Sequence, residues 1–131
     1  MVKVLDASAL LMFLEKEPGF EKVKDMFVKS SANGKYLLMT TVNLGEVYYF
    51  VMKEYSSHDA EDILALIQTF PIEIVSVDLA LARQAAQYKA GKGLPYADCF
   101  AAALAKLRKG ELVTKDKDFK AVEGEIKIVW V

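Results

Sequence analysis

Four acidic residues of this sequence stand where a charge is costly. Asp6, Glu46 and Asp98 are each the only charged residue in an apolar stretch of eleven residues or more, and Asp116 follows the short apolar run that begins at Leu112. A carboxylate among apolar side chains loses hydration unless a cation or hydrogen-bond donors compensate it. Because several such acids occur, we expect them to meet at one bound cation, which would relieve their mutual repulsion and their desolvation together.

The ligand type narrows the choice of cation. Carboxylate oxygens favour Mg²⁺, Mn²⁺ or Ca²⁺ over the metals that thiolates select. Since Mg²⁺ takes few protein ligands directly, we expect Asp6 and Asp98 to bind a first ion, while Glu46 and Asp116 act through water or hold a second one. A divalent ion lowers the pKa of its bound water, which can then attack a phosphodiester in line. No histidine base is needed, in keeping with a single His58 in a polar segment.

Smaller polar and basic side chains accompany the acids in the sequence. We expect Ser8, Thr114 and, with less support, Asn43 to hold the metal-binding carboxylates or their waters by hydrogen bonds. Lys115 and Lys117 flank Asp116 and are placed to contact substrate phosphates. The basic residues that would extend this rim are Lys92, Lys89, Arg83 and Lys16.

Each of these residues also has a plainer interpretation when it is taken alone. Asp6 is equally well explained as a helix cap, and Asp98 as a first-turn acid that favours the helix dipole. Asp116 and Asp118 are of a type common in turns, and the hydroxyls and lysines are common as caps and solvated charges. Glu46 fits such an account least, because it lies mid-helix among apolar residues. The plain interpretation therefore needs four separate coincidences.

Composition excludes several classes of protein. The 131 residues are 53% hydrophobic and 27% charged, which is typical of a globular chain, and the length favours one domain over 1–131. A net charge of −1 does not indicate a strongly basic nucleic-acid binder. One cysteine, Cys99, and one histidine exclude an intramolecular disulfide and a zinc site made of cysteine and histidine alone. The charge-free runs are too short to cross a bilayer, and no clear signal peptide is present. We therefore expect a soluble cytoplasmic protein without membrane contact.

The elements that must position the acids alternate between strand and helix. Strands are expected at 2–5, 36–39, 72–77, 112–114 and 126–131. Helices are expected from a cap at Ser8 to about 16, over 20–33, from a cap at Thr40 or Thr41 to about 54, around 63–70, after a cap at Asp78 to about 91, and from Pro95 to about 109. This alternation predicts an α/β fold of three layers, α/β/α, with a central, mainly parallel sheet of about five strands. Ligand sites of such sheets lie beyond the carboxyl ends of the strands, where all four acids fall.

Four motifs in order resemble a known family. They are Asp6-Ala-Ser8 after a hydrophobic strand, Thr40-x-x-Asn43-x-x-Glu46, Tyr96-Ala-Asp98, and Thr114-Lys-Asp116-Lys-Asp118-Phe119. The set resembles the PIN-domain nucleases over the whole chain, most closely the short VapC-type toxins of prokaryotic toxin–antitoxin pairs. This resemblance implies a Mg²⁺- or Mn²⁺-dependent endoribonuclease that acts on RNA and is held inactive by a cognate antitoxin. Its acidic quartet maps onto Asp6, Glu46, Asp98 and Asp116, and Asp118 stays open as a further ligand.

Other functions fit the residues less well. A haloacid-dehalogenase-type phosphotransferase would want a second aspartate two residues after Asp6, where Ser8 stands. A receiver domain would want an acceptor aspartate on a middle strand, and Asp78 is a poor candidate. Gly91-Lys92-Gly93 is neither a Rossmann nor a P-loop fingerprint. The serious alternative is a non-catalytic PIN-fold module that binds RNA or a protein partner, and metal-dependent cleavage of RNA separates the two.

The aromatic run Tyr48-Tyr49-Phe50 predicts assembly. Three successive residues cannot all face one side of a helix, so part of the run should be exposed or covered by a partner. We expect a symmetric homodimer. We also expect a helical antitoxin segment that lays apolar and basic side chains along a groove near the acids.

Overall fold

The computed structural model describes all 131 residues and contains one five-stranded sheet. The strands are β1 (Lys3–Leu5), β2 (Leu37–Thr40), β3 (Ile72–Val75), β4 (Glu111–Thr114) and β5 (Lys127–Trp130). The helices are α1 (Ala7–Leu14), α2 (Phe20–Asn33), α3 (Thr41–Glu54), α4 (Ser57–Ile67), α5 (Leu79–Lys92) and α6 (Tyr96–Leu107), with a 3₁₀ helix η1 (Lys117–Val122) before β5. The predicted alternation of strands and helices is confirmed.

All neighbouring strands of the sheet pair in parallel, in the order β3-β2-β1-β4-β5. The sheet is thus wholly parallel, where the sequence predicted a mainly parallel one. The chain moves outward from β1 through β2 to β3, then crosses back to place β4 on the other side of β1. The direction of winding therefore reverses at β1, and the carboxyl end of β1 is the place where an open α/β sheet forms a crevice.

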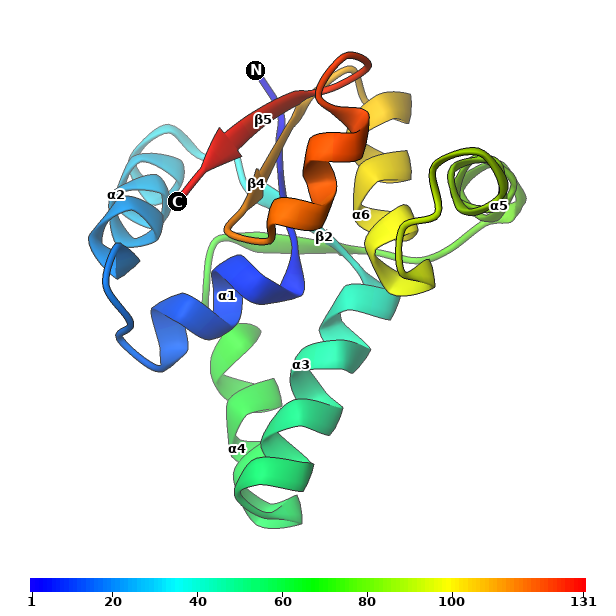
Figure 1. Cartoon of the computed structure of the whole chain (residues 1–131). Coiled ribbons are helices and arrows are strands. Elements are labelled where there is room, and N and C mark those ends of the chain that lie inside the picture. The colour runs from blue at the N-terminus through cyan, green and yellow to red at the C-terminus, as the bar shows by residue number, and fades with distance from the viewer.

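Helices cover both faces of the sheet, which explains why its strands are continuously apolar. Successive strand residues point to opposite faces, so Val4 and Leu112 pack in one core with α5 and α6. Their neighbours Leu5 and Val113 pack in the other core with α1 and α2. Figure 1 shows these helices on either side of the strands. The predicted three-layer α/β/α architecture is confirmed.

Helix α6 is the most deeply buried helix of the fold. Every residue from Asp98 to Ala105 is buried, and four of the eight are alanines, which let the helix approach the sheet closely. The first turn of α6 therefore sits at the carboxyl edge of the sheet, and Asp98 has no freedom to swing out into solvent.

The cap of α1 differs from the prediction. Asp6, and not Ser8, is the N-cap: its carboxylate accepts a hydrogen bond from the backbone N–H of Ala9 at 2.9 Å. Ser8 lies inside the first turn. The physical reason is that strand β1 ends at Leu5, so the helix begins directly after Asp6 and needs its acceptor there.

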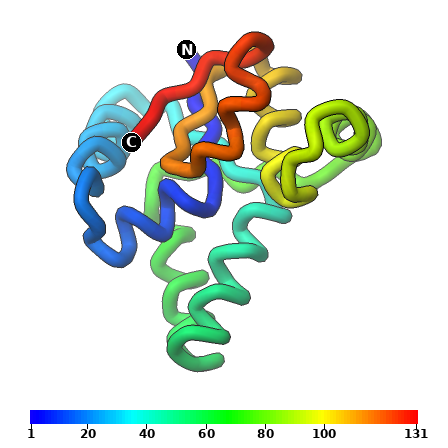
Figure 2. The backbone as a smooth tube through the Cα atoms, in the orientation of Figure 1, coloured from blue at the N-terminus to red at the C-terminus, as the bar shows by residue number.

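Helices α3 and α4 pack on each other and form a hairpin that extends away from the sheet (Figures 1 and 2). The hairpin begins at the carboxyl end of β2, so its first turns lie beside the site and its far end does not. None of the helices is long and apolar enough to cross a membrane.

Candidate active site

The structure brings the four acids Asp6, Glu46, Asp98 and Asp116 together in the lining of one cavity of about 180 Å³. They come from the end of β1, the second turn of α3, the first turn of α6 and the segment after β4. Residues far apart in the sequence thus meet at the carboxyl edge of the sheet. The larger cavity of the molecule, about 820 Å³, lies beside α2 and contains a single acid, Asp25.

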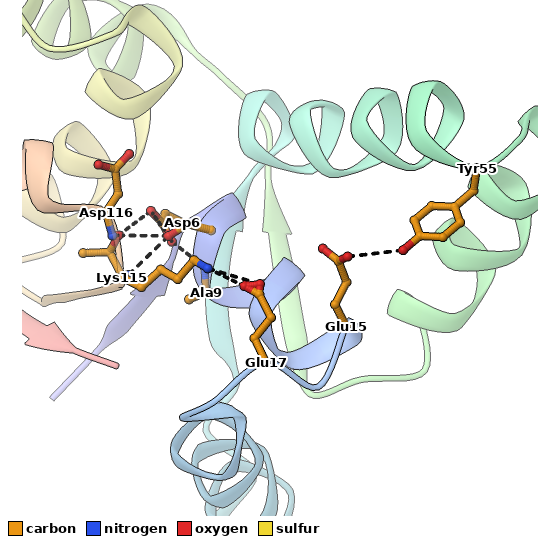
Figure 3. Close-up of polar contacts among 9 residues, drawn as sticks. Asp6, Ala9, Glu15, Glu17, Tyr55, Lys115 and Asp116 are labelled. Carbon is orange, nitrogen blue, oxygen red and sulfur yellow. Dashed lines mark hydrogen bonds and ion pairs between the residues drawn. The ribbon is translucent and has the colours of Figure 1, made fainter.

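Asp6 is almost fully buried and is held by three donors. Ser8 Oγ donates to Asp6 Oδ1 at 2.8 Å, and Thr114 Oγ1 donates to Asp6 Oδ2 at 2.6 Å, in addition to the cap from Ala9. Thr114 Oγ1 in turn accepts the backbone N–H of Asp116 at 2.9 Å. The ends of β1 and β4 are thereby tied together through one carboxylate, and Figure 3 shows Asp6 and Asp116 side by side. Burial raises the pKa of Asp6 to about 6, although all three hydrogen bonds oppose the rise.

Glu46 is positioned by a short relay of hydrogen bonds. Asn43 Nδ2 donates to Glu46 Oε1 at 2.9 Å and to the Ala97 carbonyl at 3.1 Å, so one amide links α3 to the first turn of α6. Thr40 Oγ1 donates to Asn43 Oδ1 and accepts the backbone N–H of Asn43, which caps α3. Burial raises the pKa of Glu46, and the hydrogen bond from Asn43 opposes this rise.

Thr40 is a residue of the site that the sequence interpretation missed. It was named in the motif Thr40-x-x-Asn43-x-x-Glu46 and as one of two alternative caps, but no role in positioning Glu46 was predicted for it. The signal was present in the spacing, because a cap threonine three residues before a buried asparagine can hold that side chain as well as the helix terminus.

Asp98 carries the strongest electrostatic perturbation of the site. Its residue is 9% exposed, and its Oδ2 is buried without a hydrogen-bond partner. Burial, followed by the negative charges of Asp116, Glu46 and Asp6, raises the pKa of Asp98 to about 8. A buried carboxylate oxygen without a hydrogen-bond donor, close to three other acids, would be satisfied by a bound cation or by a proton.

Asp116 and Asp118 differ in their relation to the cavity. One carboxylate oxygen from each lies with one of Asp98 in a group whose members are all within 4.8 Å of one another. Asp116 lines the cavity and also caps η1 by accepting the backbone N–H of Asp118 at 2.9 Å. Asp118 is exposed and does not line the cavity. Of the two, Asp116 is therefore the residue placed to bind the same cation as the other three acids.

The lysines predicted to meet phosphates contact the protein itself. Lys115 Nζ forms an ion pair with Glu17 (Figure 3), and Lys92 Nζ lies 3.1 Å from Glu125 Oε2. Lys117 Nζ lies 4.5 Å from the centroid of the Trp130 ring. Lys89 donates to the Leu94 carbonyl at 2.9 Å. Each of these four cations is therefore already oriented by a contact within the protein.

The donor set fits a hard divalent cation. All four acids present oxygen ligands, three of them have raised pKa values because they are buried near one another, and one buried oxygen has no partner. A bound cation would satisfy that oxygen and compensate the repulsion. Ser8 and Thr114 orient the carboxylate of Asp6 by hydrogen bonds, and Asn43 orients that of Glu46.

Solved structures of similar fold come from several bacteria. VapBC2 from Rickettsia felis, bound to a DNA fragment from its promoter, aligns over all of this chain and 99% of that chain with 18% identity and a TM-score of 0.78. DNA-bound VapBC from Salmonella typhimurium aligns over 98% and 97% with 16% identity and a TM-score of 0.73. Mycobacterium tuberculosis VapC20, described as a toxin that cleaves the sarcin–ricin loop, aligns over 92% and 94% with 15% identity and a TM-score of 0.69. These likenesses show a shared fold.

At the level of sequence, no curated protein matches this chain. The model of the PIN domain matches residues 3–125, which include strands β1 to β4 and all four clustered acids. The chain therefore belongs to the PIN-domain family.

Proposed function

We propose that this protein is a Mg²⁺- or Mn²⁺-dependent endoribonuclease, and that it acts in the cytoplasm as the toxin of a toxin–antitoxin pair. The observation that carries the proposal is the convergence of four acids from four elements on one cavity, with the buried Oδ2 of Asp98 left without a partner. A purely structural role would explain a capped Asp6 or Asp116. A purely structural role would not explain why Asp98 and Glu46 line the same cavity, where burial disfavours the charge of both.

The residues divide into those that hold a cation and those that hold its ligands. Asp6 and Asp98 are the most buried of the four clustered acids and would bind the first ion directly. Glu46 and Asp116 face the same cavity and would bind through water or hold a second ion. Ser8 and Thr114 keep Asp6 in its anionic form by donating to both of its oxygens, and Asn43 keeps one oxygen of Glu46 turned toward the first turn of α6.

A divalent ion bound by these acids supplies an activated water and neutralises the charge that develops on the phosphate. In the reaction, the water oxygen forms a bond to phosphorus and the bond from phosphorus to the 3′-oxygen breaks. The departing 3′-oxygen takes up a proton. The products are a 5′-phosphate and a 3′-hydroxyl. The 2′-hydroxyl of RNA takes no part, so a 2′,3′-cyclic phosphate is not formed.

Substitution of the ligand charges tests the proposal. Asp98→Asn and Asp6→Asn keep the side-chain volume and remove the ligand charge. We expect each to lower the rate of RNA cleavage in Mg²⁺ or Mn²⁺ by about a hundredfold or more. Asp25→Asn, an exposed aspartate outside the cavity, is the matched control and should cleave at the wild-type rate. EDTA should abolish cleavage in every variant.

Two results would reject this mechanism. One is undiminished cleavage by Asp98→Asn in a preparation freed of contaminating nuclease. The other is a 2′,3′-cyclic phosphate at the cleaved end. If the wild type binds Mn²⁺ and RNA yet cleaves no RNA, the non-catalytic PIN module becomes the better description.

The proposed antitoxin partner is supported by a groove next to the acids. A cavity of about 300 Å³ lies between α1, α3 and α4, and Leu11 and Phe50 line both it and the acid cavity. Its floor is apolar, and Glu15, Asp59 and Asp62 lie on its rim. A helical segment with apolar side chains and nearby lysines or arginines would match both properties and reach the acids from this side.

A further inference from the structure

The cavity that holds the four acids has a second wall without charge. That wall is formed by Ala7 and Leu11 of α1 and by Tyr49 and Phe50 of α3. Tyr49 lies three residues after Glu46, so the two side chains share one face of the helix. The ring of Tyr49 is therefore next to the acids and, at 60% exposure, open to solvent.

Tyr49 differs from the two neighbouring tyrosines, Tyr48 and Tyr55, in having no hydrogen bond from its hydroxyl to another helix. The hydroxyl of Tyr48 donates to Glu61 of α4, and the hydroxyl of Tyr55 donates to Glu15 at the end of α1, so both rings are tied to neighbouring helices. Tyr49 has no such bond. An aromatic ring of this size gains nothing from packing when it stays exposed at the mouth of a cavity, and such a ring is a ready surface for an apolar or aromatic ligand group.

Charge alone does not attract RNA to this place. Four acids face the cavity, and Lys115, Lys117 and Lys92 are engaged with the protein. A substrate phosphate must approach acids that repel it until a cation is bound. Contacts that do not depend on charge would add to the affinity for RNA near the cleaved bond, and the face of an aromatic ring provides such a contact to any base.

The acid cavity is too small to enclose a whole nucleotide of the RNA substrate. A volume of about 180 Å³ is smaller than the roughly 300 Å³ or more of pockets that enclose a drug-sized ligand. The cavity has room for a phosphate and part of its sugar. With the phosphate at the acids, the rest of the nucleotide would extend out of the cavity, where the exposed ring of Tyr49 lies.

We propose that Tyr49 stacks on an unpaired nucleobase next to the cleaved phosphodiester and so makes the enzyme select single-stranded RNA. This inference rests on the proposed function, because it assigns a role beside the same four acids. Bases within a duplex are already stacked on their neighbours and cannot lie against the ring. Tyr49 is a positioning residue in this scheme, since it touches the base and not the reacting atoms.

A comparison of intact and abasic substrates tests the inference. Once the cleaved bond has been mapped on a single-stranded RNA, the same RNA is made with an abasic sugar on either side of that bond. We expect the wild type to cleave the abasic RNA about tenfold or more slowly at low substrate concentration. Tyr49→Leu should cleave both RNAs at the same reduced rate, and Tyr49→Phe should behave as the wild type.

Tyr55→Leu is the matched control, because Tyr55 directly follows the last residue of α3, is also 60% exposed and does not line the acid cavity. It should keep the wild-type preference for the intact RNA. Thermal melting of each variant separates a loss of folding from a loss of stacking. A wild type that cleaves intact and abasic RNA equally, or a Tyr49→Leu variant that still prefers the intact RNA, would overturn the inference.

Failure of the proposed function has a different signature. In that case the wild type and Asp98→Asn are equally inactive on every RNA. A binding measurement then tests the inference without cleavage. Fluorescence anisotropy in Ca²⁺ compares the affinity of the protein for oligouridylate with its affinity for an abasic ribose-phosphate oligomer of the same length. Tighter binding of oligouridylate that is lost in Tyr49→Leu supports stacking, and equal binding of the two oligomers refutes it.

Discussion

At the scale of single residues, the site is built from side chains that oppose folding. Asp98 and Asp6 are buried and have pKa values raised to about 8 and about 6, so each binds a proton more readily in the folded protein than in the unfolded chain. A group of this kind stabilises the fold most when it is protonated. Ionisation of the cluster without a cation therefore costs stability, and a bound cation would reverse that cost.

The pH dependence of stability follows from these two raised pKa values. Between the unfolded value of 3.8 and the folded values, the native state holds more protons than the unfolded state, so the free energy of unfolding falls as pH rises. We expect the metal-free protein to lose stability from about pH 4 to about pH 8, through both Asp6 and Asp98 up to about pH 6 and through Asp98 above it. Glu111, whose pKa is lowered by Lys3 and Lys127, acts only below this window.

Urea denaturation in EDTA at several pH values measures this slope. Asp98→Asn should abolish the fall in the free energy of unfolding above about pH 6. The stability of this variant relative to the wild type should therefore increase toward pH 8. Saturating Mn²⁺ should flatten or invert the wild-type slope, because only the ionised acids bind the metal. A wild-type protein whose stability in EDTA rises steadily between pH 5 and pH 8 would show that these acids are not desolvated together.

At the scale of elements, the helix termini serve the site. Thr40 ends β2, caps α3 and holds Asn43, which in turn holds Glu46 and contacts the first turn of α6. Asp6 ends β1, caps α1 and lines the cavity. One side chain can therefore cap a helix and also serve the acid cavity. The reason is that a side chain that caps a helix at the carboxyl edge of a parallel sheet already lies next to the crevice.

Thr40→Val tests this coupling of cap and site. Valine keeps the shape and removes the hydroxyl, so we expect the free energy of unfolding to fall by about 1–2 kcal/mol through the lost cap. RNA cleavage should also fall at a temperature where the variant is fully folded, because Asn43 no longer has its partner. Thr41→Val, at the exposed neighbouring position, is the control and should change neither quantity by much. A Thr40→Val variant with the reduced stability but wild-type cleavage would show that the relay does not position Glu46.

At the scale of the whole molecule, several exposed apolar side chains lie on the hairpin of α3 and α4. Tyr49 and Met52 of α3, Tyr55 between the two helices and Leu66 of α4 are all more than a third exposed. The aromatic run predicted from the sequence divides in the structure, since Tyr48 bonds to Glu61 and Phe50 is half-buried, while Tyr49 faces the cavity mouth. The homodimer stays a prediction, and we expect it to use the outer end of the hairpin, where Met52 lies two residues before the last residue of α3.

Sedimentation velocity tests this assembly. We expect a dimer at roughly tens of micromolar, a range typical of moderate interfaces, and we expect Met52→Glu to shift it to monomer. Val28→Glu, which alters an apolar residue 59% exposed on α2, should leave the dimer intact. A wild-type protein that sediments only as monomer at that concentration would refute the predicted dimer.

Much of the fold and of the acid cluster could be predicted from the sequence alone. The continuous apolar runs at β1, β2 and β4 predicted strands covered on both faces, because a strand with a solvent face alternates. Lone acids inside such runs predicted their own convergence, because the topology of a parallel sheet sends all strand ends to one edge. These inferences succeeded because hydrophobic period and connection length are local properties of the chain.

Only the tertiary structure decided what each side chain touches. The sequence offered both Ser8 and Asp6 as caps of the first helix. Asp6 is the cap and Ser8 donates to it, since a two-residue difference in where α1 begins is below the resolution of a sequence pattern. Thr40 joined the site through Asn43, and the lysines of the expected phosphate rim found partners such as Glu17 and Glu125, which lie far from them in the sequence. The sequence determined which residues reach the carboxyl edge of the sheet. Packing of α3, α6 and η1 against one another decided their distances, hydrogen bonds and protonation, because those depend on contacts between segments that no local pattern encodes.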